Sequence, residues 1–154
     1  MSGAAIELNL SEVEGLARIL NGVSLGPQDR IQLLTDIGVE LEGQTQERLT
    51  GTEKKDPQGN PWKDIAEKTR KYYDRKFPKA KPPLYREGGL VDSVTSEVGG
   101  SWSVLEGAVA EYAAVHQFGW PEKNIAARAY LGVSSQNAAD IASLTQRFIA
   151  RRFT

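Results

Sequence analysis

The longest regular pattern in this 154-residue chain is an apolar repeat that runs from Gln28 to about Thr50 with a period near 3.6 residues. The apolar or small positions of the repeat are Ile31, Leu34, Ile37, Leu41, Thr45 and Leu49. Because this period places all six side chains on one face of a helix, it predicts a single long amphipathic helix. Pro27 is suited to open that helix, and Thr50-Gly51 is suited to end it.

Three further segments have helical signatures. Ser11 is a plausible N-cap with Glu14 as its capping-box partner, which predicts a short first helix. The spacing of aromatic and apolar residues over 62–76 predicts another helix, heavily basic on its outer side. Ser134 or Ser135 is placed to cap a last helix before the C-terminus.

The segment after Gly88-Gly89 changes to short β-rich runs. Two such runs surround the turn residues Gly99-Gly100 and predict a β-hairpin. We expect a third short strand at 108–110 and an extended segment at 125–132. Helices around a small antiparallel sheet make the expected fold class α+β, with the long helix and the C-terminal helix packed on the sheet.

A chain of this length is most simply one domain, 1–154, with a single core. Within it we expect an N-terminal helix and linker at 1–27, followed by the main fold at 28–154. Residues 51–89 form an exposed basic loop and linker in this interpretation. No apolar run approaches the roughly 18 residues of a membrane span, and no secretion signal opens the chain, so we expect synthesis in the cytoplasm and no membrane contact.

The chain contains no cysteine and only one histidine. These counts exclude disulfides, thiolate metal sites, cysteine nucleophiles and zinc sites built on several histidines of one chain. No phosphate-binding or dinucleotide-binding glycine motif is present either. We therefore expect no cofactor, no bound metal and no small-molecule substrate.

The histidine, His116, lies in the stretch Tyr112–Gly119, which is typical of a short helical turn that ends at the glycine. A general base would need a neighbouring nucleophile or carboxylate, and none stands at a recognisable spacing. A packed histidine whose ring nitrogens form hydrogen bonds is the favoured interpretation. A small hydrolase that uses His116 is the distant alternative.

Charge is distributed unevenly along the chain. Residues 1–52 hold three Arg against eight acidic residues, whereas 53–86 hold eleven Lys and Arg against five acidic residues. A chain with this polarity could pair its own segments, meet a charged partner or stack head to tail with copies of itself. The basic stretch is interleaved with Trp62, Tyr72, Tyr73 and Phe77, a pattern that also fits a nucleic-acid-binding module. A solvated helix face and linker is the favoured interpretation of this stretch. Trp62 and Trp120, each beside a proline, are expected at an interface rather than in the core.

Three segments of the sequence resemble the phage virion morphogenesis family, which includes the tail completion proteins of Mu-like and P2-like phages. The first contains Asp56, Pro57, Gly59, Pro61 and Trp62, followed by Ile65 and Thr69. The second runs from Leu84 and Arg86 to Leu90 and Ser93. The third and most specific contains Tyr112, His116, Gln117, Phe118 and Gly119, then Arg128, Leu131 and Gly132. Together with the long helix, the resemblance covers roughly residues 28–150.

The resemblance implies a non-enzymatic structural protein that completes the tail or joins it to the head, in the tail or neck of a phage, a prophage or a tail-like particle. It implies contacts with other tail or neck proteins and a homo-oligomeric ring, with a transient contact to DNA left open. We expect the basic region, including Lys79, Lys81 and Arg86, to face a neighbouring subunit or another neck protein. Binding of nucleic acid through 53–86 is the alternative function.

Overall fold

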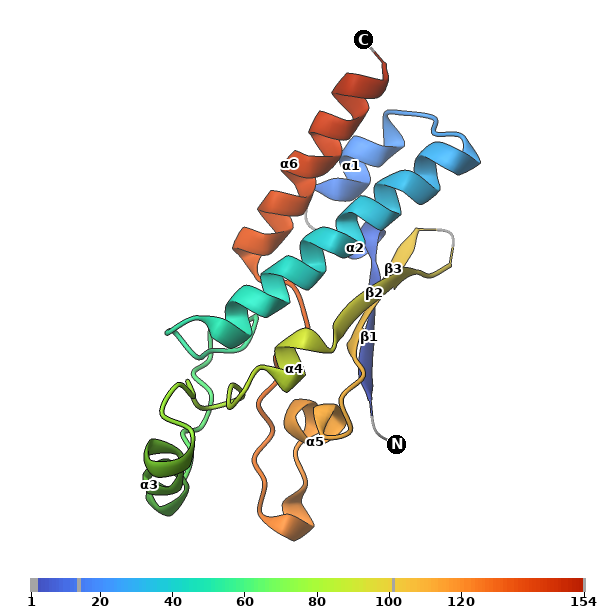
Figure 1. Ribbon diagram of the computed structural model, residues 1–154. Coiled ribbons are helices and arrows are strands. Elements are labelled where there is room, and N and C mark those ends of the chain that lie inside the picture. The colour runs from blue at the N-terminus through green and yellow to red at the C-terminus, as the bar shows by residue number, and fades with distance from the viewer. Residues whose placement is uncertain (1–2, 14, 101, 154) are drawn as a thin grey trace.

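The computed structural model describes residues 3–13, 15–100 and 102–153. Within these ranges it contains six α-helices, two short 3-10 helices and one three-stranded antiparallel sheet. The expected α+β class, with a long helix and a C-terminal helix beside a small sheet, is confirmed (Figure 1).

The sheet has the strand order β1-β3-β2, with β1 at Ala4–Asn9, β2 at Val94–Val98 and β3 at Ser103–Ala108. The predicted hairpin is present as β2 and β3. The predicted third strand at 108–110 is wrong, because β3 ends at Ala108 and the N-terminal segment pairs with its other edge instead. Sequence analysis assigned no structure to residues 4–9.

Helix α2, Pro27–Thr50, lies across one face of the sheet and contacts β2 and β3 (Figure 1). Its buried face carries Leu33, Leu34, Ile37, Leu41 and Leu49, which confirms the predicted long helix. Gly38 allows the close approach, since a Cβ atom there would lie 2.6 Å from the Ser96 hydroxyl oxygen. Ile31 is 51% exposed, so the apolar stripe covers less of the first turns than the repeat predicted.

One core lies between α2, the N-terminal segment and the C-terminal helix. The 3-10 helix η1 (Leu10–Glu12) and α1 (Leu16–Asn21) supply leucines that pack against α2 and α6 (Ser135–Arg152). The predicted first helix begins later than expected, after Gly15, because Ser11 lies within η1; Glu14 lies outside the described residues. Ser134 caps α6 as predicted, accepting a hydrogen bond of 3.0 Å from the Asn137 backbone N–H.

The second core lies at the opposite end of the sheet, where several short elements meet. Among them are α4 (Gly89–Asp92) and α5 (Ala113–Phe118), whereas the residues of α3 (Glu67–Lys76) and η2 (Pro121–Lys123) are not part of this core. The predicted helix over 62–76 begins only at Glu67, and Trp62 is buried in this core with 8% of its surface exposed. The expectation that Trp62 would lie outside the core is therefore wrong.

Candidate functional site

The residues of the three family-like segments meet around the second core, although they come from distant parts of the chain. The loop 53–64, helix α5 and the extended segment 125–132 lie against one another there. Helix α5 ends at Phe118, and Gly119 follows it with a φ of 77°. Both the helical turn and its glycine end were predicted from the stretch around His116.

Gln117 joins α5 to the extended segment through its side chain. Its Oε1 atom accepts hydrogen bonds from the backbone N–H groups of Tyr130, at 3.0 Å, and Leu131, at 3.1 Å. The Tyr130 hydroxyl donates in return to the carbonyl oxygen of Ala113 at 2.9 Å. All of these groups are buried, so each hydrogen bond satisfies an atom that water cannot reach.

Trp62 and Arg128 tie the extended segment to the loop before α3. The Trp62 indole Nε1–H donates to the Ala129 carbonyl oxygen at 2.8 Å. The Arg128 guanidinium donates to the carbonyl oxygens of Lys63, at 2.5 Å, and Asp64, at 3.1 Å. Both side chains thus bind backbone of the opposite segment, which is a positioning role.

Gly119 and Gly132 occupy positions where a side chain would not fit. A Cβ atom on Gly119 would lie 2.8 Å from the Ala127 backbone nitrogen, and one on Gly132 would lie 2.9 Å from Pro57 Cγ. Both glycines have positive φ, 77° and 141°, which L side chains rarely adopt. The close approach of the segments therefore depends on these two positions.

The loop that contains Pro57 is shaped by Asp56. Its carboxylate accepts hydrogen bonds from the Asn60 backbone N–H at 2.8 Å and from the Asn60 side chain at 3.2 Å. Gly59 has a φ of 92°, and Lys55 and Pro61 form an isolated antiparallel bridge. The loop is a closed turn that presents Pro57 to Gly132 and Trp62 to the core.

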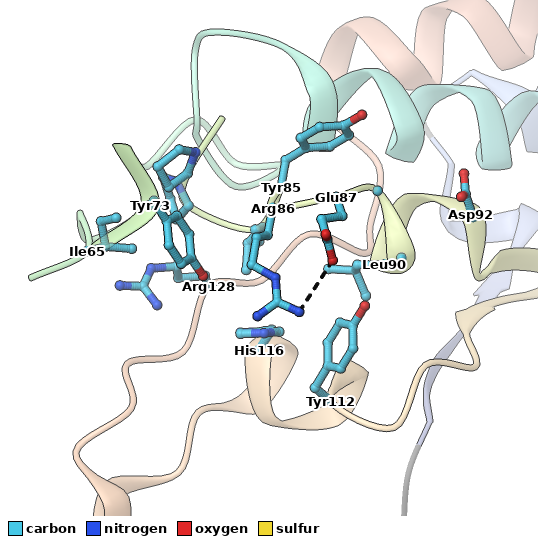
Figure 2. A pocket seen from close by; sticks show the side chains of 15 residues that line it. Ile65, Tyr73, Tyr85, Arg86, Glu87, Leu90, Asp92, Tyr112, His116 and Arg128 are labelled. Atoms are coloured by element: carbon cyan, nitrogen blue, oxygen red, sulfur yellow. Dashed lines mark ion pairs between the residues drawn. The ribbon is translucent and has the colours of Figure 1, made fainter. Parts of the chain in front are cut away.

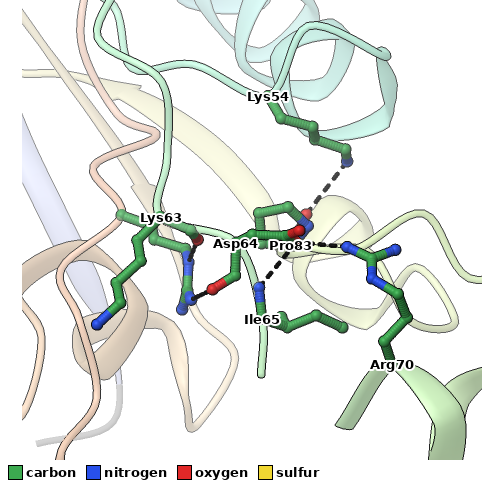
Figure 3. A network of polar contacts seen from close by, with 7 residues as sticks. Lys54, Lys63, Asp64, Ile65, Arg70 and Pro83 are labelled. Atoms are coloured by element: carbon green, nitrogen blue, oxygen red, sulfur yellow. Dashed lines mark hydrogen bonds and ion pairs between the residues drawn. The ribbon is translucent and has the colours of Figure 1, made fainter. Parts of the chain in front are cut away.

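Two cations at the end of α2, which the sequence analysis did not identify, complete the site. Arg48 donates to the Tyr130 carbonyl oxygen and to Asn137 Oδ1, both at 2.6 Å. The Lys54 ammonium donates to the Leu49 carbonyl oxygen at 2.8 Å and to the Pro83 carbonyl oxygen at 3.1 Å (Figure 3). Burial, and then the charge of Lys81, lower the pKa of Lys54 to about 8. The sequence gives no signal of these contacts, because Arg48 lies on the polar side of a predicted helix and Lys54 lies in a loop.

Glu106 of β3 is a fully buried acid beneath α2. Its Oε1 atom accepts a hydrogen bond from the Thr45 hydroxyl, and its Oε2 atom is buried without a partner among the described residues. Burial raises the pKa of Glu106 to about 7, although the Thr45 hydrogen bond and the nearby Arg48 act to lower it. The sequence alternation of β3 did not reveal an acid on the buried face.

His116 lines a pocket of about 390 Å³ between α5 and the segment 82–90. Figure 2 shows Arg86 pointing toward the His116 ring, with Tyr112 on one side and Tyr73 on the other. Burial, and then the charge of Arg128, lower the pKa of His116. Its Nδ1 atom is buried without a hydrogen-bond partner among the described residues. The prediction that both ring nitrogens form hydrogen bonds is therefore wrong, and no carboxylate among the described residues is hydrogen-bonded to Nδ1.

The residues expected at an interface have different surroundings. Trp120 is 43% exposed, and the Lys123 ammonium lies 5.7 Å from its ring centre. Lys79 is exposed, as are Lys81 and Arg86, but Arg86 also lies 4.8 Å from the Phe77 ring centre. Of the residues expected at an interface, only Trp62 is buried in the core.

Helix α3 lies apart from the rest of the fold, at the far end of the loop that follows Trp62 (Figure 1). None of its ten residues is buried. Asp64 precedes it and accepts a hydrogen bond of 2.5 Å from Arg70 (Figure 3). Helix α3 is therefore exposed, and it follows a loop that Trp62 and Arg128 hold in place.

Within the described ranges, no helix is long and apolar enough to cross a membrane, and no group of His, Asp and Glu side chains is arranged to hold a metal ion. The site has the character of a scaffold, because its signature residues bind backbone atoms of neighbouring segments.

Comparison with known proteins identifies the relationship. No curated protein and no solved structure matches the chain. The model of the phage virion morphogenesis family matches residues 11–150, which include all three family-like segments. The chain therefore belongs to the phage virion morphogenesis family.

Proposed function

We propose that this morphogenesis protein completes the tail of a phage particle, joins the tail to the head, or does both, as a non-enzymatic neck component. The observation that carries the proposal is the family match over 11–150, which spans nearly the whole fold. The geometry supports it, because signature residues such as Gln117 and Trp62 bind three segments together. A joining protein needs such a rigid body to present its contact surfaces.

The partners in this proposal are other tail or neck proteins and further copies of the chain in a ring. Exposed aromatic side chains support contacts of this kind, since Phe118 and Trp120 lie on the surface beside the signature cluster. Aromatic residues are enriched in protein interfaces, because a large ring gains much from leaving water. Lys79 and Lys81 add exposed positive charge near the same end.

Replacement of both lysines by glutamine tests this placement. Lys79→Gln with Lys81→Gln should leave folding unchanged, because both side chains are exposed, and should lower the yield of joined particles. Arg147→Gln with Arg151→Gln is a matched control, since both arginines are exposed on α6 and neither forms an ion pair within the described residues. An undiminished yield of joined particles from the Lys79 and Lys81 variant would contradict a role for these lysines.

Binding of nucleic acid is the second candidate function, favoured by the basic exposed surface of α3 and its exposed Tyr72. Phosphate contacts by lysine and arginine would make the affinity fall steeply with salt concentration. A duplex DNA titration at two salt concentrations therefore decides this candidate. No binding at physiological ionic strength would remove it.

Electron microscopy of particles from the parent element tests the main proposal. Deletion of the gene should give filled heads beside unjoined or abnormal tails, and expression of the chain in trans should restore joined particles. Normal joined particles after deletion would contradict the proposal.

A further inference from the structure

Helix α3 has an outer stripe of exposed side chains, of which only Tyr72 has a ring contact outside the stripe among the described residues, at 5.9 Å between its ring centre and that of Phe77 and 6.2 Å from that of Tyr73. Lys68, Lys71, Tyr72 and Arg75 recur at helical spacing, all four are exposed, and we call them the α3 stripe. On the opposite side of the helix, Tyr73 lines the pocket that also contains His116 and Arg128, and its ring centre lies 5.8 Å from that of Phe77 at the end of the helix. A ten-residue helix is marginal in water without tertiary packing, so a covered stripe would stabilise it.

The α3 stripe also carries charge that the chain does not neutralise. Lys71 lies 3.6 Å from Glu67, with both side chains largely exposed, so this ion pair contributes little. Lys68 and Arg75 form no ion pair within 3–13, 15–100 and 102–153. The guanidinium of Arg75 instead lies 5.8 Å from the Tyr72 ring centre. The stripe is therefore a basic surface with an aromatic ring at its centre.

The sheet presents a complementary surface on the face turned away from α2. Because side chains alternate along a strand, this face carries the residues that flank those packed on α2. They are Ala5, Glu7, Thr95, Glu97, Leu105 and Gly107, and we call them the open sheet face. A shallow hollow of about 410 Å³ lies over part of it.

The register makes the open sheet face acidic at its edges and apolar at its centre. Glu7 on β1 and Glu97 on β2 lie on either side of Leu105 on β3. None of the three strands contains Lys or Arg. Val109, which follows β3 beside the hollow, is 66% exposed. An apolar surface between two carboxylates suits a helix that carries cations around an aromatic ring.

The two surfaces also agree in size and position. Ten residues of α-helix extend about 15 Å, close to the roughly 20 Å length of a six-residue strand. Figure 1 shows α3 apart from the sheet, so the two surfaces do not cover each other within one chain. Two different, complementary surfaces on one chain form a head-to-tail contact, which closes into a ring when the rotation allows.

We propose that the α3 stripe of one copy docks on the open sheet face of the next copy. This contact covers both surfaces and pairs Lys68, Lys71 and Arg75 with Glu7 and Glu97. Nucleic acid would cover only the stripe, since phosphates are repelled by the acidic sheet face. The inference rests on the proposed function, in which copies of the chain form a ring in the neck, and it specifies that ring's interface.

Single-cysteine variants of the full chain test the contact, because the native chain contains no cysteine. Lys71→Cys and Thr95→Cys each replace an exposed residue. An equimolar mixture treated with a short bismaleimide should give a covalent dimer, and neither variant alone should do so. Lys71→Cys mixed with Gln28→Cys, whose thiol is at an exposed position on α2, is the matched control. Equal dimer yields in the two mixtures would overturn the proposal.

Exchanging the charges of Glu97 and Lys68 tests whether the yield of cross-linked dimer depends on the proposed pairing. Glu97→Lys in the Thr95→Cys chain should lower the dimer yield several-fold, because it places a cation opposite Lys68. Lys68→Glu in the Lys71→Cys chain should then restore the yield. Lower yield without restoration would contradict the proposed pairing.

These results are independent of particle assembly, so the two proposals can fail separately. Cross-linking as expected together with normal particles after gene deletion would overturn the neck function alone. Unjoined particles after deletion without specific cross-linking would overturn the interface alone.

Discussion

Glu106 places a carboxyl group in the core, where burial raises its pKa to about 7. Between its ordinary pKa of 4.5 and about pH 7, the folded chain holds a proton that the unfolded chain has lost. The free energy of unfolding should therefore decrease as pH rises through this window. Glu106→Gln removes this titration and keeps an acceptor for the Thr45 hydroxyl. As the pH rises through the window, the free energy of unfolding of the variant should therefore increase relative to that of the native chain by up to about 3 kcal/mol. Denaturant unfolding at pH 4.5 and 8 checks this, and a difference independent of pH would contradict it.

Gln117 accepts two backbone hydrogen bonds with one buried oxygen atom. Gln117→Leu leaves the N–H groups of Tyr130 and Leu131 unpaired, and each unpaired buried group costs about 1–3 kcal/mol. The free energy of unfolding should fall by several kcal/mol, as measured by denaturant unfolding. Gln136→Leu is the control, because Gln136 bonds only Asp140 on an exposed helix surface and should change stability by less than about 0.5 kcal/mol. Similar effects of both substitutions would contradict the role of Gln117.

At the scale of elements, two glycines should respond in opposite directions to alanine. Gly43 lies inside α2, and a Cβ atom there would meet nothing within 4 Å. Gly43→Ala should therefore stabilise the chain by roughly 0.5–1 kcal/mol. Gly119 has positive φ, and its Cβ atom would meet the Ala127 nitrogen, so Gly119→Ala should destabilise the chain by at least about 1 kcal/mol. Thermal unfolding checks both, and the same sign for both variants would contradict this account of α5.

The elements that sequence predicts are those whose signal is local. The periodicity of α2 and the Ser134 cap of α6 are contained within a few turns, and both were predicted. Strand β1 was not, because Ala4 pairs with Ala108 across the length of the chain. The burial of Trp62 depends in the same way on Ala129, which accepts its indole hydrogen bond. The signature residues could be selected by resemblance, but their positioning roles became visible only with the three segments in contact.

For the whole molecule, the proposed function separates two groups of residues: those that stabilise the fold and those that make contacts in the assembled particle. Lys68→Ala with Arg75→Ala should change the free energy of unfolding by less than about 0.5 kcal/mol, because neither side chain is buried. The same variant should lower the yield of joined particles. Denaturant unfolding of the purified variant, together with particle counts, checks both statements. A large loss of stability would mean that α3 belongs to the folded core.

In the proposed function, this chain is a structural part of the phage neck that is needed after heads and tails have formed. In vitro complementation tests it most directly: purified chain is added to a lysate made without the gene, and joined particles are counted by electron microscopy. Separate heads and tails should become joined in proportion to the amount of native chain added, and heat-denatured chain should not replace it. Joined particles in the lysate before any addition would contradict the claim.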